Sequence, residues 1–176
     1  MGRIVVSQFV TVDGVMEDPG GSEGMERGGW AFQFNRGEDG DKFKLDEVME
    51  SSALLLGRRT YEGFAAAWPT REGNFADKFN TMPKYVVSST LSDPEWSNST
   101  VIGTGDLAKL RDDEDGVILV NGSRRLVDEF RLMVFPVVLG KGKQLFGDTS
   151  GTKALELVES RPVGAEGVLV LVYRPK

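Results

Sequence analysis

The chain has 176 residues, contains no cysteine and no histidine, and carries 21 basic and 27 acidic side chains, which gives a net charge of −6. This composition excludes disulfide frameworks, cysteine nucleophiles, zinc ribbons, Ser-His-Asp triads and imidazole metal sites, and we predict no metal. The acidic balance argues against nucleic acid or an anionic membrane as a partner, and the length predicts one domain over residues 1–176.

The N-terminal sequence, MGRIVVSQFV, shows no signal-peptide pattern, and no apolar stretch is long enough to span a membrane. We therefore expect a cytoplasmic protein.

Eight apolar runs of strand length occur along the chain. They are Ile4–Val12, Ala53–Leu56, Tyr85–Val87, Thr100–Ile102, Val117–Val120, Phe130–Leu139, Leu155–Val158 and Val168–Tyr173. The first, third and fifth are rich in β-branched residues and nearly continuous, which is typical of parallel strands buried on both faces.

Helical patterns separate several of these runs, at Asp41–Ser51, Thr60–Ala67 and Phe75–Asn80. Alternating strands and helices predict an α/β fold with a mixed, mostly parallel sheet of about eight strands and flanking helices. The last two runs flank the turn-rich stretch Arg161–Gly167, which predicts a C-terminal antiparallel hairpin.

The segment Glu17–Gly40 is long for a connection and combines seven glycines with Trp30, Phe32 and Phe34. Connections of this length without secondary structure are usually functional or disordered. One interpretation is a surface loop whose aromatic side chains pack back onto the core. The other is a lid that faces a substrate, with Trp30 and Phe32 as the contacting residues.

The connection between the runs ending at Val120 and beginning at Phe130 is only nine residues long. A parallel crossover needs about a dozen residues or more, usually with a helix. Either these two strands are antiparallel neighbours, or the chain lacks a crossover helix.

Three strands end in small, hydroxyl-bearing or basic residues. The sequences are Gly57-Arg58-Arg59-Thr60, Ser88-Ser89-Thr90 and Asn121-Gly122-Ser123-Arg124-Arg125. The carboxyl ends of parallel strands line one edge of a sheet, where glycine admits a ligand, helix starts offer N–H groups and guanidinium groups bind phosphate. Together they predict a site for a polyphosphorylated nucleotide, although neither a Rossmann fingerprint nor a P-loop is present.

Five segments carry a resemblance to a known family. They are VVSQFVTVDGVME from Val5, LLGRRTYEGF from Leu55, KYVVSSTL from Lys84, VILVNGSRR from Val117 and DEFRLMVFPVVLGKGKQLF from Asp128. In this order they resemble the dihydrofolate-reductase-like family, which includes the reductase domain of bacterial riboflavin biosynthesis and small stand-alone dihydrofolate reductase family proteins. The resemblance implies a single-domain dihydrofolate-reductase-like fold, NADPH as hydride donor and a homodimer.

The resemblance also implies which residues contact the cofactor. Gly57, Arg58, Arg59 and Thr60 would contact its phosphates, Ser88, Ser89 and Thr90 would lie at the adenosine phosphate, and Gly122, Ser123, Arg124 and Arg125 would hold the pyrophosphate. Val12, Asp13 and Gly14 would lie near the nicotinamide. Arg58, Arg59, Ser89 and Arg124 favour NADPH over NADH, because the extra phosphate needs additional cationic and hydroxyl partners.

Two carboxylates are candidates for promoting protonation of the substrate. The family spacing, counted back from Gly57, leads to Asp41, where a helix cap is the alternative role. Asp13 is the competitor, with Asp-Gly turn chemistry as its alternative, and Glu17 is a third choice.

We therefore predict an NADPH-dependent oxidoreductase similar to dihydrofolate reductase or 5-amino-6-(5-phosphoribosylamino)uracil reductase. It would transfer hydride to a small heterocyclic or carbonyl substrate, such as a pterin or a pyrimidine. The alternative is a non-catalytic nucleotide-binding module or ligand sensor on the same scaffold.

Overall fold

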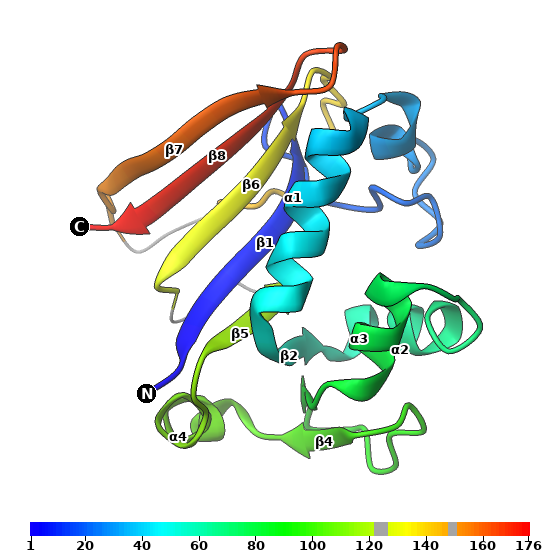
Figure 1. Cartoon of the computed structure of the whole chain (residues 1–176), viewed down its shortest axis with the longest axis vertical. Coiled ribbons are helices and arrows are strands. Elements are labelled where there is room, and N and C mark those ends of the chain that lie inside the picture. Colours follow the sequence, from blue (N-terminus) through cyan, green and yellow to red (C-terminus); the bar gives the residue numbers. More distant parts are fainter. Residues whose placement is uncertain (122–126, 148–150) are drawn as a thin grey trace. The chain divides into compact units, whose positions relative to one another are not determined.

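A computed structural model gives the structure of the chain and describes residues 1–121, 127–147 and 151–176. Its strands are β1 (Arg3–Thr11), β2 (Ser51–Gly57), β3 (Lys84–Val87), β4 (Ser99–Ile102), β5 (Val117–Asn121), β6 (Glu129–Phe135), β7 (Leu155–Val163) and β8 (Val168–Pro175). They form one sheet in the order β4-β3-β2-β5-β1-β6-β8-β7 (Figure 1). All eight predicted strands and the α/β fold class are confirmed.

The described helices are α1 (Gly37–Glu50), α2 (Arg58–Ala67), α3 (Asn74–Thr81) and α4 (Leu107–Asp113). The first three confirm the predicted helices with shifted ends. The sequence did not predict α4, because its seven residues offer little apolar periodicity beyond Leu107 and Leu110. In the part of the chain that the structure describes, no helix has both the length and the apolar character that crossing a bilayer requires.

The residues cluster into two compact units. Unit 1 comprises Met1–Val5 and Lys44–Ser123, and unit 2 comprises Val6–Phe43 and Arg124–Lys176. Each unit has an apolar cluster of its own. One domain over residues 1–176 stays a prediction.

The parallel strands of unit 1 are aligned at their carboxyl ends. β2 pairs with β3 so that Gly57 lies opposite Val87, and with β5 so that Leu56 lies opposite Asn121. The middle of β2 is an apolar, buried run, and β2 has a parallel, hydrogen-bonded neighbour on each side. β2, β3 and β5 therefore end at one edge of the sheet, and the residues that follow β2 and β3 leave it there.

The antiparallel strands of unit 2 differ from the prediction at their ends. β6 stops at Phe135 rather than Leu139, because Pro136 has no N–H to continue the ladder. β7 runs on to Val163, so the turn of the predicted hairpin is shorter and occupies residues 164–167. β8 pairs with both β6 and β7, which confirms the C-terminal hairpin.

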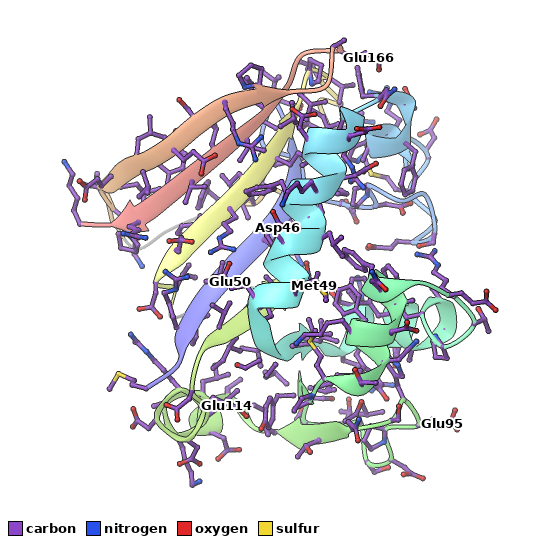
Figure 2. The ribbon with its side chains drawn as sticks, in the orientation of Figure 1. Asp46, Met49, Glu50, Glu95, Glu114 and Glu166 are labelled. Carbon is purple, nitrogen blue, oxygen red and sulfur yellow. The ribbon has the colours of Figure 1, made fainter. Side chains whose placement is uncertain are left out.

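The hairpin turn contacts the start of α1 within unit 2. The Gly164 N–H donates to the Asp39 carboxylate at 3.0 Å, and the Asn35 N–H donates to the Glu166 carboxylate at 2.5 Å. Glu166 lies at this turn (Figure 2). Gly164 has a φ of +63°, and a Cβ there would lie 2.5 Å from the Asn35 carbonyl oxygen, so only glycine fits.

The long segment 17–40 is held against unit 2, as the first of its two interpretations expects. The buried Asp18 carboxylate accepts hydrogen bonds from the Glu23 and Met25 amides at 2.9 and 3.0 Å. Trp30 packs edge-on against Phe135 with ring centroids 5.6 Å apart, and Phe34 lies 6.1 Å from the same ring. The segment thus contributes Trp30 and Phe34 to the apolar cluster of unit 2, whereas Phe32 is exposed.

The short connection after β5 does not join neighbouring strands. β1 lies between β5 and β6 in the sheet, so the expectation that they are antiparallel neighbours is wrong. Seven residues, 122–128, separate the two strands along the chain. Residues 122–126 lie outside the described part of the structure.

We predict that Phe135→Ala lowers the free energy of unfolding by about 3–5 kcal/mol, because it empties a fully buried site surrounded by Phe9, Trp30 and Phe34. Chemical denaturation monitored by circular dichroism measures the change. Phe32→Ala is the matched control: Phe32 is exposed, and its loss should cost under about 0.5 kcal/mol. Similar costs for the two variants would contradict the packing described.

Candidate functional site: a strand-end site and a carboxylate-anchored loop

Unit 1 presents the predicted phosphate-binding residues at one sheet edge, which we call the strand-end site (residues 57–60 and 88–90). α2 begins directly after β2, with Gly57 as its N-cap, and no side chain among the described residues caps the helix. The first N–H groups of a helix have no partner within it and carry its positive dipole end. A Cβ built at Gly57 meets no described atom within 4 Å, so nothing in the described part of the chain packs against Gly57 at that position.

Arg58 links the ends of β2 and β3. Its guanidinium donates to the Thr90 hydroxyl through Nη1 and to the Glu62 carboxylate through Nε at 2.7 Å. The Arg58–Glu62 pair is about half exposed, so it contributes little to stability and can give way to a competing anion.

The turn after β3 is built around a hydroxyl. The Ser88 side chain accepts hydrogen bonds from the amides of Thr90 and Leu91 at 3.2 and 3.0 Å. Ser89, Thr90 and Arg59 are exposed. The strand-end site therefore combines an uncapped helix start, exposed hydroxyls and two arginines, a donor set suited to phosphate oxygens.

Unit 2 holds the predicted carboxylate Asp13 in a different environment. Asp13 accepts hydrogen bonds from the Thr11 hydroxyl at 2.6 Å and from the amides of Leu139 and Gly140 at 3.2 and 2.7 Å. The Thr11 hydrogen bond, supported by the two amides and opposed by partial burial, lowers the pKa of the Asp13 carboxyl. Asp13 is thus an anion at neutral pH and a poor proton donor.

Glu17 completes the anchoring of the loop that follows β6. Its carboxylate accepts the Lys143 amide at 2.8 Å, and its carbonyl accepts the Trp30 indole N–H at 2.9 Å. An isolated bridge pairs Val15 with Gln144. We call residues 139–145, fixed by Asp13 and Glu17, the carboxylate-anchored loop. Sequence reasoning missed this loop, because its binding groups are backbone amides that no side-chain pattern reveals.

Asp41 is on α1, four residues beyond the first residue of the helix, and does not cap it. Its exposed carboxylate accepts a hydrogen bond from Arg36 Nε at 2.5 Å. The helix-cap alternative for Asp41 is therefore wrong, because the helix begins earlier than the sequence predicted.

The expected substrate contacts divide into a buried and an exposed residue. Trp30 is 1% exposed and its indole N–H is satisfied, which argues against the expected stacking of Trp30 on a substrate. Phe32 is 74% exposed, and Val12, at the end of β1, is exposed as well.

The predicted contacts Gly122, Ser123, Arg124 and Arg125 lie outside the described residues. Within residues 1–121, 127–147 and 151–176, no cluster of acidic residues that could hold a metal ion is present.

Comparison with known proteins gives matches over nearly the whole chain. Residues 3–169 match the model of the family described as the RibD C-terminal domain. The chain is 28% identical to the uncharacterized protein YyaP of Bacillus subtilis (strain 168), over 97% of this chain and 94% of that protein.

Two solved structures share the fold. A putative riboflavin biosynthesis protein from Shewanella sp. PV-4 matches with a TM-score of 0.76 and 18% identity, over 99% of both chains. Dihydrofolate reductase from Enterococcus faecalis, complexed with NADP(H) and RAB-propyl, matches with a TM-score of 0.62 and 14% identity, over 99% of this chain and 97% of the reductase.

We predict that Asp13→Asn destabilises the protein by on the order of 1–2 kcal/mol at neutral pH, because the amide replaces a charged acceptor of three hydrogen bonds. The pKa of Asp13 is lower in the folded state, so its contribution is complete above the unfolded pKa and is lost as pH falls through the folded pKa. Denaturation of both proteins between pH 7 and acid pH measures this. A stability difference that persists unchanged into strong acid would contradict it.

Proposed function

Because the chain belongs to the RibD C-terminal domain family, we propose that it is an NADPH-dependent reductase that acts on a small heterocyclic or carbonyl substrate, such as a pterin or a pyrimidine. The observation that carries the proposal is the strand-end site, where Arg58 joins the end of β2 to the end of β3 beside an uncapped helix start. When bound, NADPH supplies the hydride, and the protein contributes binding and orientation.

In this proposal the strand-end site holds the phosphates of the cofactor. The amides at the start of α2 and the exposed hydroxyls of Ser89 and Thr90 donate hydrogen bonds, and Arg58 and Arg59 supply positive charge. Thr60 follows on the same helix start. Two arginines and adjacent hydroxyls suit a cofactor with a phosphate beyond the pyrophosphate, which favours NADPH over NADH. Gly122, Ser123, Arg124 and Arg125 remain proposed pyrophosphate contacts from the family resemblance alone.

The proposed roles of the unit 2 residues follow their environments. Asp13, already bound by three donors, orients the carboxylate-anchored loop and keeps its negative charge there. Asp41 has an exposed carboxylate and is the proposed group for relaying a proton to the substrate. The exposed Phe32 and Val12 are the proposed apolar contacts for flat rings.

A second candidate function is a non-catalytic nucleotide-binding module. It is favoured by the state of the two carboxylates, since Asp13 is committed to loop amides and Asp41 to Arg36. Oxidation of NADPH in the presence of pterins, pyrimidines and small carbonyls separates the two functions. Turnover with any of them supports the reductase, whereas cofactor binding without turnover supports the module.

We predict that NADPH binds more tightly than NADH, and that Arg58→Ala weakens NADPH roughly ten- to hundredfold by removing a charged donor. Isothermal titration calorimetry measures both affinities. Arg71→Ala is the control: Arg71 is an exposed arginine of unit 1 that stacks on Trp68 away from the strand ends. Equal affinities for NADPH and NADH, or equal effects of the two substitutions, would overturn the assignment of the strand-end site.

The homodimer and the cytoplasmic location are also part of the proposal. β7 is the edge strand of the sheet and exposes Leu157 and Val158, a surface of the kind that another chain can cover. We predict a dimer by analytical ultracentrifugation that Leu157→Lys converts to a monomer. A wild-type protein that sediments as a monomer at all concentrations tested would contradict this.

A further inference from the structure

Lys84, the first residue of β3, is a fully buried lysine at 0% exposure. Its ammonium donates to three carbonyl oxygens, those of Asn80 at 3.1 Å, Met82 at 2.8 Å and Ser97 at 2.9 Å. It also lies 4.4 Å from the centroid of the Trp96 ring, within cation–π distance. All three donor positions of the ammonium are therefore used, which is the condition for burying a charge.

These carbonyls come from two different segments of unit 1. Asn80 and Met82 lie at the C-terminal end of α3, where the last carbonyls of a helix lack partners within it. Ser97 lies in the connection between β3 and β4, residues 88–98, which has neither helix nor strand. A single ammonium thus joins the end of a helix to a connection that has no regular hydrogen bonding of its own.

Further hydrogen bonds surround the same point. The Trp96 indole N–H donates to the Asn80 carboxamide at 2.8 Å, and the Trp96 amide donates to the Tyr61 hydroxyl at 2.9 Å. The Asn98 carboxamide donates to the Thr81 carbonyl at 2.8 Å. Three consecutive residues of the connection, 96–98, are thereby attached to the helical part of unit 1, and Lys84 lies among them.

The other end of the connection carries part of the strand-end site. Residues 88–90 follow β3 at the carboxyl edge of the sheet, and Thr90 receives the Arg58 hydrogen bond. A connection of eleven residues without secondary structure keeps one conformation only where its side chains and backbone are fixed. In residues 88–98 the buried anchor is Trp96, next to the carbonyl that Lys84 binds.

We propose that Lys84 is a positioning residue whose ammonium fixes residues 88–98 and thereby places Ser88–Thr90 for the phosphates of the cofactor. The proposal rests on the proposed function for its last step. The anchoring step stands on the geometry of unit 1 alone and is tested separately.

The environment of Lys84 makes this anchor sensitive to pH. Burial lowers the pKa of Lys84 to about 8, and no charged neighbour adds to the shift. The groups that face the ammonium are three carbonyls and an indole. Glu95, the acidic residue that precedes Trp96, is exposed at the periphery of the connection (Figure 2). Because the lowered pKa means that the closed connection holds the neutral amine better than the opened one does, opening takes up a proton above pH 8, and the connection should become harder to open as pH rises from 8 toward 10.5.

The test is hydrogen exchange of Lys84→Met, with Lys153→Met as the matched control because Lys153 is exposed in unit 2. At pH 7 we expect the amides of residues 88–98 to exchange at least about tenfold faster in Lys84→Met, while those of β5 and the Lys153→Met protein stay unchanged. Adding propylammonium to Lys84→Ala should restore protection of residues 88–98, whereas neutral propanol should not. Unchanged exchange in residues 88–98 overturns the proposal.

The wild-type protein provides a test that does not depend on a variant folding. Opening that exposes Lys84 returns its pKa toward 10.5, so protection factors of residues 88–98, corrected for the intrinsic rate, should stay level below pH 7 and rise between pH 8 and pH 10. Constant protection across this range overturns the anchoring role.

Cofactor affinity separates this inference from the proposed function. If wild type binds NADPH, Lys84→Met should weaken it roughly five- to tenfold at pH 7, and an unchanged affinity overturns the positioning role. If wild type binds no NADPH, the proposed function fails, while the exchange measurements still decide whether Lys84 anchors the connection.

Discussion

The register of β2 with its two parallel neighbours is the constraint on which the strand-end site depends. Gly57 lies opposite Val87 and Leu56 opposite Asn121, so the three strands β2, β3 and β5 end at one level of the sheet. The register is fixed by burial: a shift would move β-branched and leucine side chains out of the apolar cluster of unit 1. Helix α2 then begins at this edge, with glycine rather than a capping side chain before it. Packing in the core thus determines where the polar groups meet.

In both units a charged side chain binds backbone groups of a segment without helix or strand. The charge is negative in unit 2 and positive in unit 1. In unit 2 the carboxylates of Asp13 and Glu17 accept hydrogen bonds from amide N–H groups of the carboxylate-anchored loop. In unit 1 the ammonium of Lys84 donates hydrogen bonds to carbonyl oxygens of α3 and of residues 88–98. A charge-assisted hydrogen bond is stronger than a neutral one, so one ionised side chain can order several residues that have no helix or strand partners. The net charge of −6 says nothing about either arrangement.

The sequence predicted the strands and helices that have a continuous apolar run or a regular apolar spacing. It did not predict features that depend on a single contact between residues distant in sequence. Continuous apolar runs revealed all eight strands, and the family resemblance is confirmed by the match over residues 3–169. The predicted end of β6 was wrong because the apolar run continues past Pro136, and a count of apolar residues does not register that proline lacks an N–H. The sequence left two interpretations of Trp30 open, because Phe135, the ring that Trp30 packs against, is distant in sequence. Lys84 was overlooked because a lysine in a β-branched run gives no sign that three carbonyls surround it.

The phosphate role of the strand-end site is tested most directly by backbone NMR of the protein titrated with 2′,5′-ADP, which carries the phosphates of the cofactor but no nicotinamide. We predict that within residues 1–121 the largest amide shift changes fall on residues 57–60 and 88–90, at the ends of β2 and β3. Smaller changes should extend along residues 91–98 toward Lys84. Saturable shifts confined to other residues, or no saturable shifts at all, would show that the aligned strand ends do not form a phosphate site.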